Sequence, residues 1–307
     1  MRKILCLLVV GAFIFGAIGI SFAGENNNKK ITVFARIKVL PNKSEQAKRF
    51  LLNKVLPPTR QEPGCINYDM HEGRGTDPDN FDTPIDGYFM FYENWRSRED
   101  WDKHMNMPYL QEWSALCNGS GNKAGICAEP PEVTIWEMID IPSNAVFRGT
   151  LPGPEKYTLS ALVTIREKDD PACTEAFLPP PYPPNTKIKD CVDRSYKEML
   201  ALVPQTHLEP GCVNYEMHVG LEMEDNARNY RKYLFYENWY DFDVWKYDHM
   251  GSAYLVNWFN LVPIVTVPVN GAVLEGWKMI SSKGLECYNQ DCKDKDKDKD
   301  KDKDKKK

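Results

Sequence analysis

The chain is 307 residues long, with 42% hydrophobic and 27% charged residues and a formal net charge of −5. This length and apolar content suffice for two domains with packed cores. Arg2 and Lys3 contribute +2, and the lysine–aspartate alternation of Lys293–Lys307 contributes +3, so the remaining residues carry −10. An acidic body of this kind excludes nucleic acid as the main partner.

Residues 1–23 are predicted to form a secretory signal peptide. Two basic residues precede an uncharged apolar run from Ile4 to Phe22, and Ser21 and Ala23 are the small residues of a cleavage site. An uncleaved membrane anchor is the alternative, since the run approaches the length that spans a bilayer. Cleavage predicts a periplasmic or secreted protein without stable membrane insertion.

Residues 30–141 are predicted to form an α+β unit. Apolar alternation predicts the strands, while capping residues and a proline predict the helix starts. The expected elements are a strand over Ile31–Val39, a helix from Ser44 to about Leu56, strands over Cys65–Glu72 and Tyr88–Trp95, a helix capped at Ser97, a helical segment from Pro108 and a strand over Glu132–Met138. This βαββαβ order is ferredoxin-like.

The unit occurs twice, because long blocks of the first half return in the second. Glu62–His71 (EPGCINYDMH) returns as Glu209–His218 (EPGCVNYEMH), and Phe91–Trp95 (FYENW) returns unchanged as Phe235–Trp239. Residues 155–283 are therefore predicted to be the second unit, joined by a Pro- and Gly-bearing linker over 142–154. Helices cover one face of such a sheet, so each sheet is expected to cover the other in a fused pseudo-dimer that needs no further oligomer.

The cysteines outside the leader are even in number, which suits an oxidising compartment. Their spacing predicts local disulfides between Cys117 and Cys127, Cys173 and Cys191, and Cys287 and Cys292, leaving Cys65 and Cys212 as buried free thiols. Residues 284–307 are then a short Cys-closed loop followed by a solvated, disordered tail. The cysteines and histidines form no pattern that indicates a zinc site.

A Pro-Gly-Cys turn into strand two, a Glu-x-Trp ending strand three and a histidine on the next helix resemble the antibiotic biosynthesis monooxygenase family. That family forms dimeric α/β barrels and includes small quinol monooxygenases. The resemblance covers nearly all of Ile31–Met138 and Tyr157–Met279. It implies an oxygenase without flavin or metal, whose substrate is an electron-rich phenol or quinol and whose co-substrate is O₂.

The resemblance implies that the catalytic residues are Asn94, Trp95 and His104 in the first unit and Asn238, Trp239 and His249 in the second. Histidine would remove the substrate proton, while Trp and Asn would stack on and hydrogen-bond the ring. The Trp-to-His spacing is nine residues in the first unit and ten in the second, which predicts unequal sites and favours the first. Neither first strand contains the Asn that haem-degrading relatives use.

Several of these residues also have structural interpretations. His104 and His249 can be satisfied core histidines, and Trp95 can be a packing residue. On strand two, Asn67, Asp69 and His71 share one face, as acid–base machinery or as a polar network between the sheets. The Leu178–Pro184 stretch predicts a stiff loop, either a lid over the second site or a bridged surface insertion. The alternative function is a non-catalytic periplasmic module that binds a small aromatic ligand.

Overall fold

The computed structural model describes residues 29–75, 83–121, 123–139, 157–222 and 227–280. The predicted signal peptide, the 142–154 linker, the Cys287–Cys292 pair and the tail lie outside the described residues. The first half denotes the described residues from 29 to 139, and the second half denotes those from 157 to 280.

The first half contains four long strands and six helical segments that follow the predicted order. They are β1 (Ile31–Lys38), η1 (Pro41–Lys43), α1 (Ser44–Phe50), the π-helix η2 (Leu51–Val55), α2 (Leu56–Thr59), β2 (Cys65–Arg74), β3 (Pro84–Trp95), α3 (Arg98–Met105), α4 (Pro108–Asn118), the short strands β4 (Gly119–Ser120) and β5 (Lys123–Ala124), and β6 (Glu132–Met138). Ser97 caps α3 as predicted, since its Oγ accepts from the Asp100 N–H at 3.1 Å.

The first helix runs further than predicted. It continues through Pro57 and Pro58 to Thr59, whereas the sequence predicted an end near Leu56. Prolines remove amide donors from a helix. Here the carbonyl groups that lose those donors belong to the preceding turn, Leu52 to Lys54, where Asn53 and Lys54 are exposed to water.

The second half repeats this plan with one insertion. Its elements are β7 (Tyr157–Thr164), α5 (Pro171–Thr174), α6 (Cys191–Thr206), β8 (Cys212–Leu221), β9 (Arg228–Trp239), the π-helix η3 (Val244–His249), α7 (Ala253–Val265) and β10 (Ala272–Met279). Within the described residues, no helix is long and apolar enough to cross a membrane.

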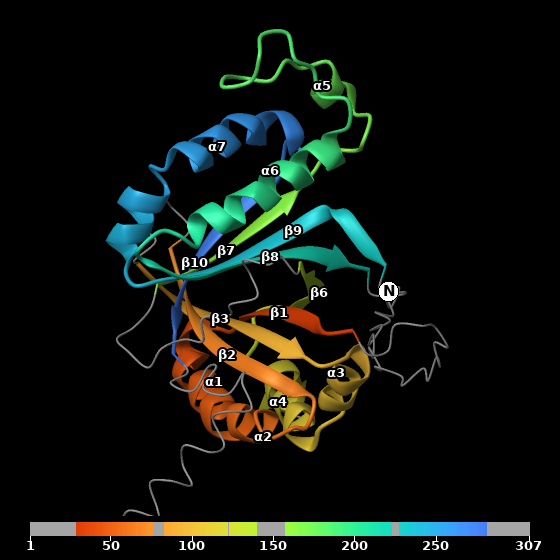
Figure 1. Cartoon of the computed structure of the whole chain (residues 1–307). Helices are drawn as coiled ribbons and strands as arrows, with labels where there is room; N and C mark the ends of the chain where they lie inside the picture. The colour runs from red at the N-terminus through yellow and green to blue at the C-terminus, as the bar shows by residue number, and fades with distance from the viewer. Residues whose placement is uncertain (1–28, 76–82, 122, 140–156, 223–226, 281–307) are drawn as a thin grey trace, which may run out of the picture.

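The eight long strands close into one antiparallel barrel in the order β1-β3-β2-β10-β7-β9-β8-β6. Each half contributes four neighbouring strands, and β2 pairs with β10 while β6 pairs with β8. Every sheet edge is therefore paired with the other half, which removes exposed strand edges. In Figure 1 the two sheets face one another, with α1–α4 on one outer face and α6 and α7 on the other. The predicted α+β fold with ferredoxin-like strand order is confirmed.

Three apolar clusters follow from this layering. One lies between the helices and sheet of each half, and the third fills the barrel interior around Phe34, Tyr92, Tyr236 and Trp277. Successive side chains of a strand point to opposite faces. Each strand therefore supplies one set of side chains to the helix face and another to the barrel interior.

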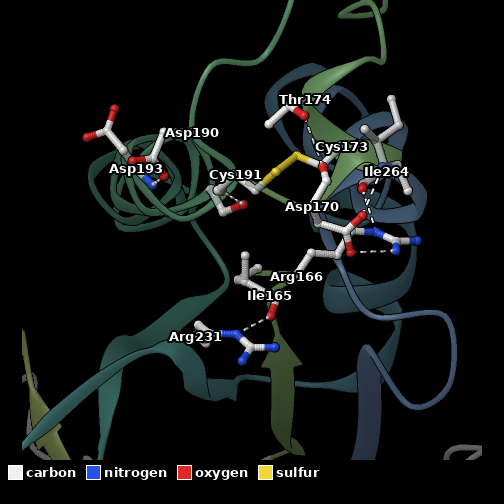
Figure 2. Close-up of a disulfide and its surroundings, with 12 residues drawn as sticks. Ile165, Arg166, Asp170, Cys173, Thr174, Asp190, Cys191, Asp193, Arg231 and Ile264 are labelled. Atoms are coloured by element: carbon white, nitrogen blue, oxygen red, sulfur yellow. Dashed lines mark hydrogen bonds and ion pairs between the residues drawn. A yellow bond between two sulfur atoms is a disulfide. The ribbon is translucent and has the colours of Figure 1, made fainter. Parts of the chain in front are cut away.

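Two of the predicted disulfides are present, Cys117–Cys127 and Cys173–Cys191. Cys65 and Cys212 are thiols outside them, and Cys212 is buried as predicted, whereas Cys65 is only half-buried. Figure 2 shows that the second disulfide ties α5 to the start of α6, beside Arg166, which donates to the Ile264 carbonyl at 2.9 Å. The 16-residue α6 separates this end from Glu209 by about 24 Å. The Pro-rich insertion is thus a bridged surface feature at the far end of the helix layer, and the lid interpretation is wrong.

Candidate active sites on the helix faces

The helix face of the first half gathers an imidazole, a carboxylate and a phenol around one indole. His104 Nδ1 lies 2.7 Å from Glu62 Oε1, and Tyr109 donates its hydroxyl to the same carboxylate. The Trp95 ring centre lies 4.6 Å from the His104 ring centre, and Tyr68 closes the other side at 5.5 Å. The turn before β2 supplies Glu62, while α3 and α4 supply His104 and Tyr109.

A second carboxyl group completes this cluster from the end of β3. Glu93 Oε2 accepts the indole N–H of Trp95 at 2.9 Å, and the side chain is 4% exposed. Burial raises the pKa of Glu93 to about 8, opposed only in part by hydrogen bonds from Trp95 and Tyr68. Burial also lowers the pKa of His104, although Glu62 opposes this shift. The neutral imidazole can therefore donate its Nδ1 proton to Glu62 and keep Nε2 as a base.

The second half contains the same arrangement. His249 Nδ1 lies 3.0 Å from Glu209 Oε2, Tyr254 donates to Glu209, and the Trp239 and His249 ring centres are 4.4 Å apart. Glu237 accepts the Trp239 indole N–H at 3.1 Å, and its Oε2 lies 3.9 Å from His249 Nε2. Burial raises the pKa of Glu237.

The one-residue difference in Trp-to-His spacing does not separate the two sites, contrary to the sequence-based inference. The extra residue of the second half lies in η3, a π-helix in which the Met250 N–H reaches back five residues to the Trp245 carbonyl at 3.0 Å. A π-turn takes up one residue and leaves the next part of the helix in the same position. His249 thus meets the same partner types as His104, and the preference for the first site loses this support.

Asn94 and Asn238 do not join these clusters. Adjacent strand residues face opposite sides, so Trp95 points to the helices and Asn94 points into the barrel. Asn94 donates to Asn67 Oδ1 at 2.6 Å and accepts from Thr32 at 2.5 Å. Asn238 does the same with Asn214 and Thr158, at 2.6 and 2.7 Å. The predicted Asn–Trp–His grouping is therefore split between two faces of the sheet.

The barrel interior contains a polar network that joins the halves. Tyr92 and Tyr236 stack at 3.7 Å between ring centres. Tyr92 donates to Glu216 at 2.5 Å and meets His218 Nε2 at 3.0 Å, while the Tyr236 hydroxyl lies 3.0 Å from His71 Nε2. Burial lowers the pKa of His71 to about 3 and of His218 to about 4, so both are neutral. These contacts favour the interpretation of the strand-two polar face as a network between sheets.

The helix-face clusters are covered in this structure. His104, Trp95, His249 and Trp239 are at most 2% exposed. Two surface hollows of about 330 and 340 Å³ lie elsewhere, one beside the 117–127 disulfide loop and one beside Tyr88 and Glu275. Among the described residues, no group of three or more His, Cys, Asp and Glu side chains is arranged to hold a metal ion.

The amino-acid sequence is similar to a known protein family. The family model described as antibiotic biosynthesis monooxygenase matches residues 30–116. A Mycobacterium tuberculosis protein named "Putative monooxygenase Rv0793" is 31% identical over 110 residues, which span 36% of this chain and 92% of that protein. An uncharacterized Synechocystis protein is 32% identical over 110 residues, which span 36% of this chain and 64% of that relative.

Solved structures extend the likeness over most of the chain. A Fusobacterium nucleatum structure described as a "Putative monooxygenase" aligns with a TM-score of 0.53 at 11% identity, covering 85% of this chain and 98% of that chain. An "anthrone oxidase-like protein" aligns with a TM-score of 0.50 at 13% identity, covering 85% and 95%. At these identities the likeness concerns the fold alone.

These matches define the class of the protein. The chain belongs to the antibiotic biosynthesis monooxygenase family, and the family supports a monooxygenase-type function in general terms.

Four residues of each cluster were not predicted from the sequence as site residues. Glu62, Tyr68, Glu93 and Tyr109 each recur in the second half, as Glu209, Tyr215, Glu237 and Tyr254. Their recurrence was the available signal. The sequence could not place them together, because Glu62 and His104 lie 42 residues apart and meet only in the fold.

Proposed function

We propose that the protein is an exported, cofactor-independent monooxygenase that oxidises a quinol or a related polyphenol at the helix-face clusters. The observation that carries this proposal is the His104–Glu62 contact of 2.7 Å beside Trp95, repeated as His249–Glu209 beside Trp239. A buried imidazole with a carboxylate on one nitrogen is a general base with a fixed tautomer.

The protein has two tasks in this reaction, which are to remove a proton and to hold the substrate in an aromatic site without water. His104 Nε2 takes a proton from a substrate hydroxyl, and Glu62 stabilises the imidazolium that results. The phenolate is electron-rich enough to reduce O₂ directly. One oxygen atom enters the ring and the other leaves as water, so the substrate supplies all four electrons that O₂ takes up.

Substrate entry requires a local opening, because the cluster side chains are covered. Tyr109 and Glu62 lie at the outer side of the cluster, and Asn106–Met107 forms the short connection between α3 and α4. Displacement of this connection would expose the His104 and Trp95 rings together. Local openings of this kind occur in the less stable parts of a fold.

The same closed packing favours a second candidate, a non-catalytic periplasmic module that binds a small aromatic ligand. In that case the His–Glu–Tyr contacts are structural, and the ligand occupies the aromatic cluster without turnover. Tight binding of a hydroquinone with no oxygen consumption would support this candidate over the monooxygenase.

The proposal includes the layout of the chain. We infer two fused units, over residues 30–141 and 155–283, arranged as a pseudo-dimer. The strand orders β6-β1-β3-β2 and β10-β7-β9-β8 support this, because each places equivalent strands in equivalent positions. Export by a cleaved signal over residues 1–23 fits the two disulfides, which form in oxidising compartments.

Oxygen uptake with a panel of hydroquinones tests the assignment. His104→Ala and His249→Ala should each remove the turnover of one site, and the double variant should lose turnover altogether. His71→Asn is the matched control, because it removes an equally buried imidazole from the barrel interior. Uptake that survives the double variant would overturn the role of these histidines.

A further inference from the structure

A buried carboxyl group lies beside the tryptophan of each cluster, and in the second half it faces the histidine from the side opposite its first carboxylate. Glu93 and Glu237 lie two residues before the ends of β3 and β9, directly before Asn94 and Asn238, and both are 4% exposed. Each accepts the indole N–H of the tryptophan two residues on, at 2.9 and 3.1 Å. Glu237 Oε2 also lies 3.9 Å from His249 Nε2, while Glu209 occupies Nδ1 of the same ring.

The groups that face this carboxyl come from every element packed around it. In the first half, Trp95 on β3 and Tyr68 on β2 donate hydrogen bonds to it, and Cys65 on β2 and Glu62 in the preceding turn interact with its charge. His104 on α3 contacts the Trp95 and Tyr68 rings, and Tyr109 on α4 binds Glu62. Burial, together with the nearby Glu62, raises the pKa of Glu93 to about 8, although the hydrogen bonds from Trp95 and Tyr68 lower it. At neutral pH Glu93 is therefore mostly a carboxylic acid, and burial acts on Glu237 in the same direction.

The two carboxyl groups of a cluster thus differ in what they can do. Glu62 binds the His104 imidazole and the Tyr109 hydroxyl, and it assists the histidine that removes the substrate proton. Glu93 sits among an indole, a phenol and a thiol and keeps its proton. When environments push neighbouring titratable groups apart in this way, the pair defines a base and an acid.

We propose that Glu93 and Glu237 are the acids of the reaction, which give a proton to the oxygen atom that leaves as water. This inference rests on the proposed monooxygenase function. His104 removes the hydroxyl proton, and O₂ then adds to the ring carbon of the anion as C–O–O⁻. Glu93 protonates that peroxide to C–O–O–H. Loss of the carbon-bound hydrogen as a proton and cleavage of the O–O bond leave a ring carbonyl and one water molecule.

The cluster regains every proton that it gives up during the reaction. The reaction consumes the Glu93 proton and leaves one extra proton on the imidazole. Transfer of that proton from the imidazole Nε2 to the carboxylate restores both groups. In the second half His249 Nε2 and Glu237 Oε2 are 3.9 Å apart, so a small side-chain movement brings them within hydrogen-bond distance. The ring hydrogen released as a proton joins the leaving hydroxide as water. The indole N–H holds the carboxyl in place throughout.

The test compares the wild-type chain with the double variant Glu93→Gln/Glu237→Gln. Glutamine keeps the shape and the acceptor for the indole but cannot give up a proton. We expect turnover to fall at least about 100-fold, with an increased share of the consumed oxygen released as hydrogen peroxide or superoxide. We also expect the alkaline decline of the wild-type activity near pH 8 to disappear.

Glu216→Gln is the matched control, because Glu216 is a carboxyl of similar burial and raised pKa on the other face of the sheet. It should leave turnover and product ratio unchanged. Glu93→Asp/Glu237→Asp, which retains a titratable group, should recover part of the oxygenated product. Unchanged turnover, product ratio and pH profile in the Gln variant would overturn the acid role while loss of activity in the histidine variants still upheld the proposed function. A wild-type chain without turnover would overturn both.

Discussion

The buried carboxyl groups make stability depend on pH in a direction opposite to that of most acidic side chains. Burial raises the pKa of Glu93 and of Glu216 from 4.5 to about 8. The folded protein therefore holds protons that the unfolded chain has already released, and stability falls as the pH rises toward 8. From these values, raising the pH from 6.5 to 8 lowers the free energy of unfolding by about 2 kcal/mol for each carboxyl.

Two other groups act in the opposite direction over the same interval. Burial lowers the pKa of His71 to about 3 and of His218 to about 4, so these imidazoles are protonated only in the unfolded chain near pH 6.5. Their loss of protons above that pH returns less than about 1 kcal/mol each. The net loss for the wild-type chain between pH 6.5 and 8 is then about 2–3 kcal/mol from these four groups.

Glu93→Gln and Glu216→Gln isolate the effect. Each variant should reduce the pH-dependent loss by about 2 kcal/mol, and the two reductions should add, because the residues lie on opposite faces of the sheet. The measurement is urea unfolding at pH 6.5, 7.25 and 8 with the disulfides intact, followed by tryptophan fluorescence. A Glu93→Gln chain that loses as much stability as the wild type over this interval would refute the reasoning.

Two further changes test the packing of the halves. Tyr92→Phe removes a hydroxyl bound to both Glu216 and His218, whereas Tyr236→Phe removes a contact with His71. We expect Tyr92→Phe to lower the free energy of unfolding by about 1–3 kcal/mol and Tyr236→Phe to lower it by less. Equal losses for the two variants in chemical unfolding would contradict the network. Gly211→Ala should destabilise the chain by about 1–3 kcal/mol and perturb the environment of Trp239, because a Cβ there would lie 1.8 Å from Val244 Cγ1 at the start of η3. An alanine chain with wild-type stability and fluorescence would show that the close approach is not required.

The fold was largely predictable because its signals are local and occur twice. The alternation of Ile31–Lys38, the Ser97 cap and the Pro108 helix start each lie within a few residues, and the second half repeats the order with different side chains. The extension of the first helix past Leu56 was not predictable from proline alone. It depends on which carbonyl groups face water, and tertiary packing decides that.

The candidate sites were predicted only in part, for two physical reasons. Asn94 and Trp95 are neighbours in sequence but face opposite sides of β3, and the family-based grouping ignored that alternation. The histidine spacing suggested unequal sites, but a π-turn in η3 absorbs the extra residue. Glu62 lay within a matched block and Tyr109 recurs as Tyr254, yet nothing local indicates that both contact His104.

The recurrence of Asn94 and Asn238 follows from the geometry of the strand end rather than from contact with a substrate. In both halves the pairing of strand two with strand three shifts by one residue, between Cys65 and Asn67 and between Cys212 and Asn214. A bulge of this kind bends the strand and re-aims the neighbouring side chains. The Asn94–Asn67 hydrogen bond of 2.6 Å lies directly beyond the shift.

That hydrogen bond fixes β3 where Glu93 and Trp95 emerge on the other face. The interior asparagines therefore position the carboxyl and the indole of the helix-face cluster without entering it. One face holds the strand end in register, and the other presents the indole and the carboxyl of the helix-face cluster.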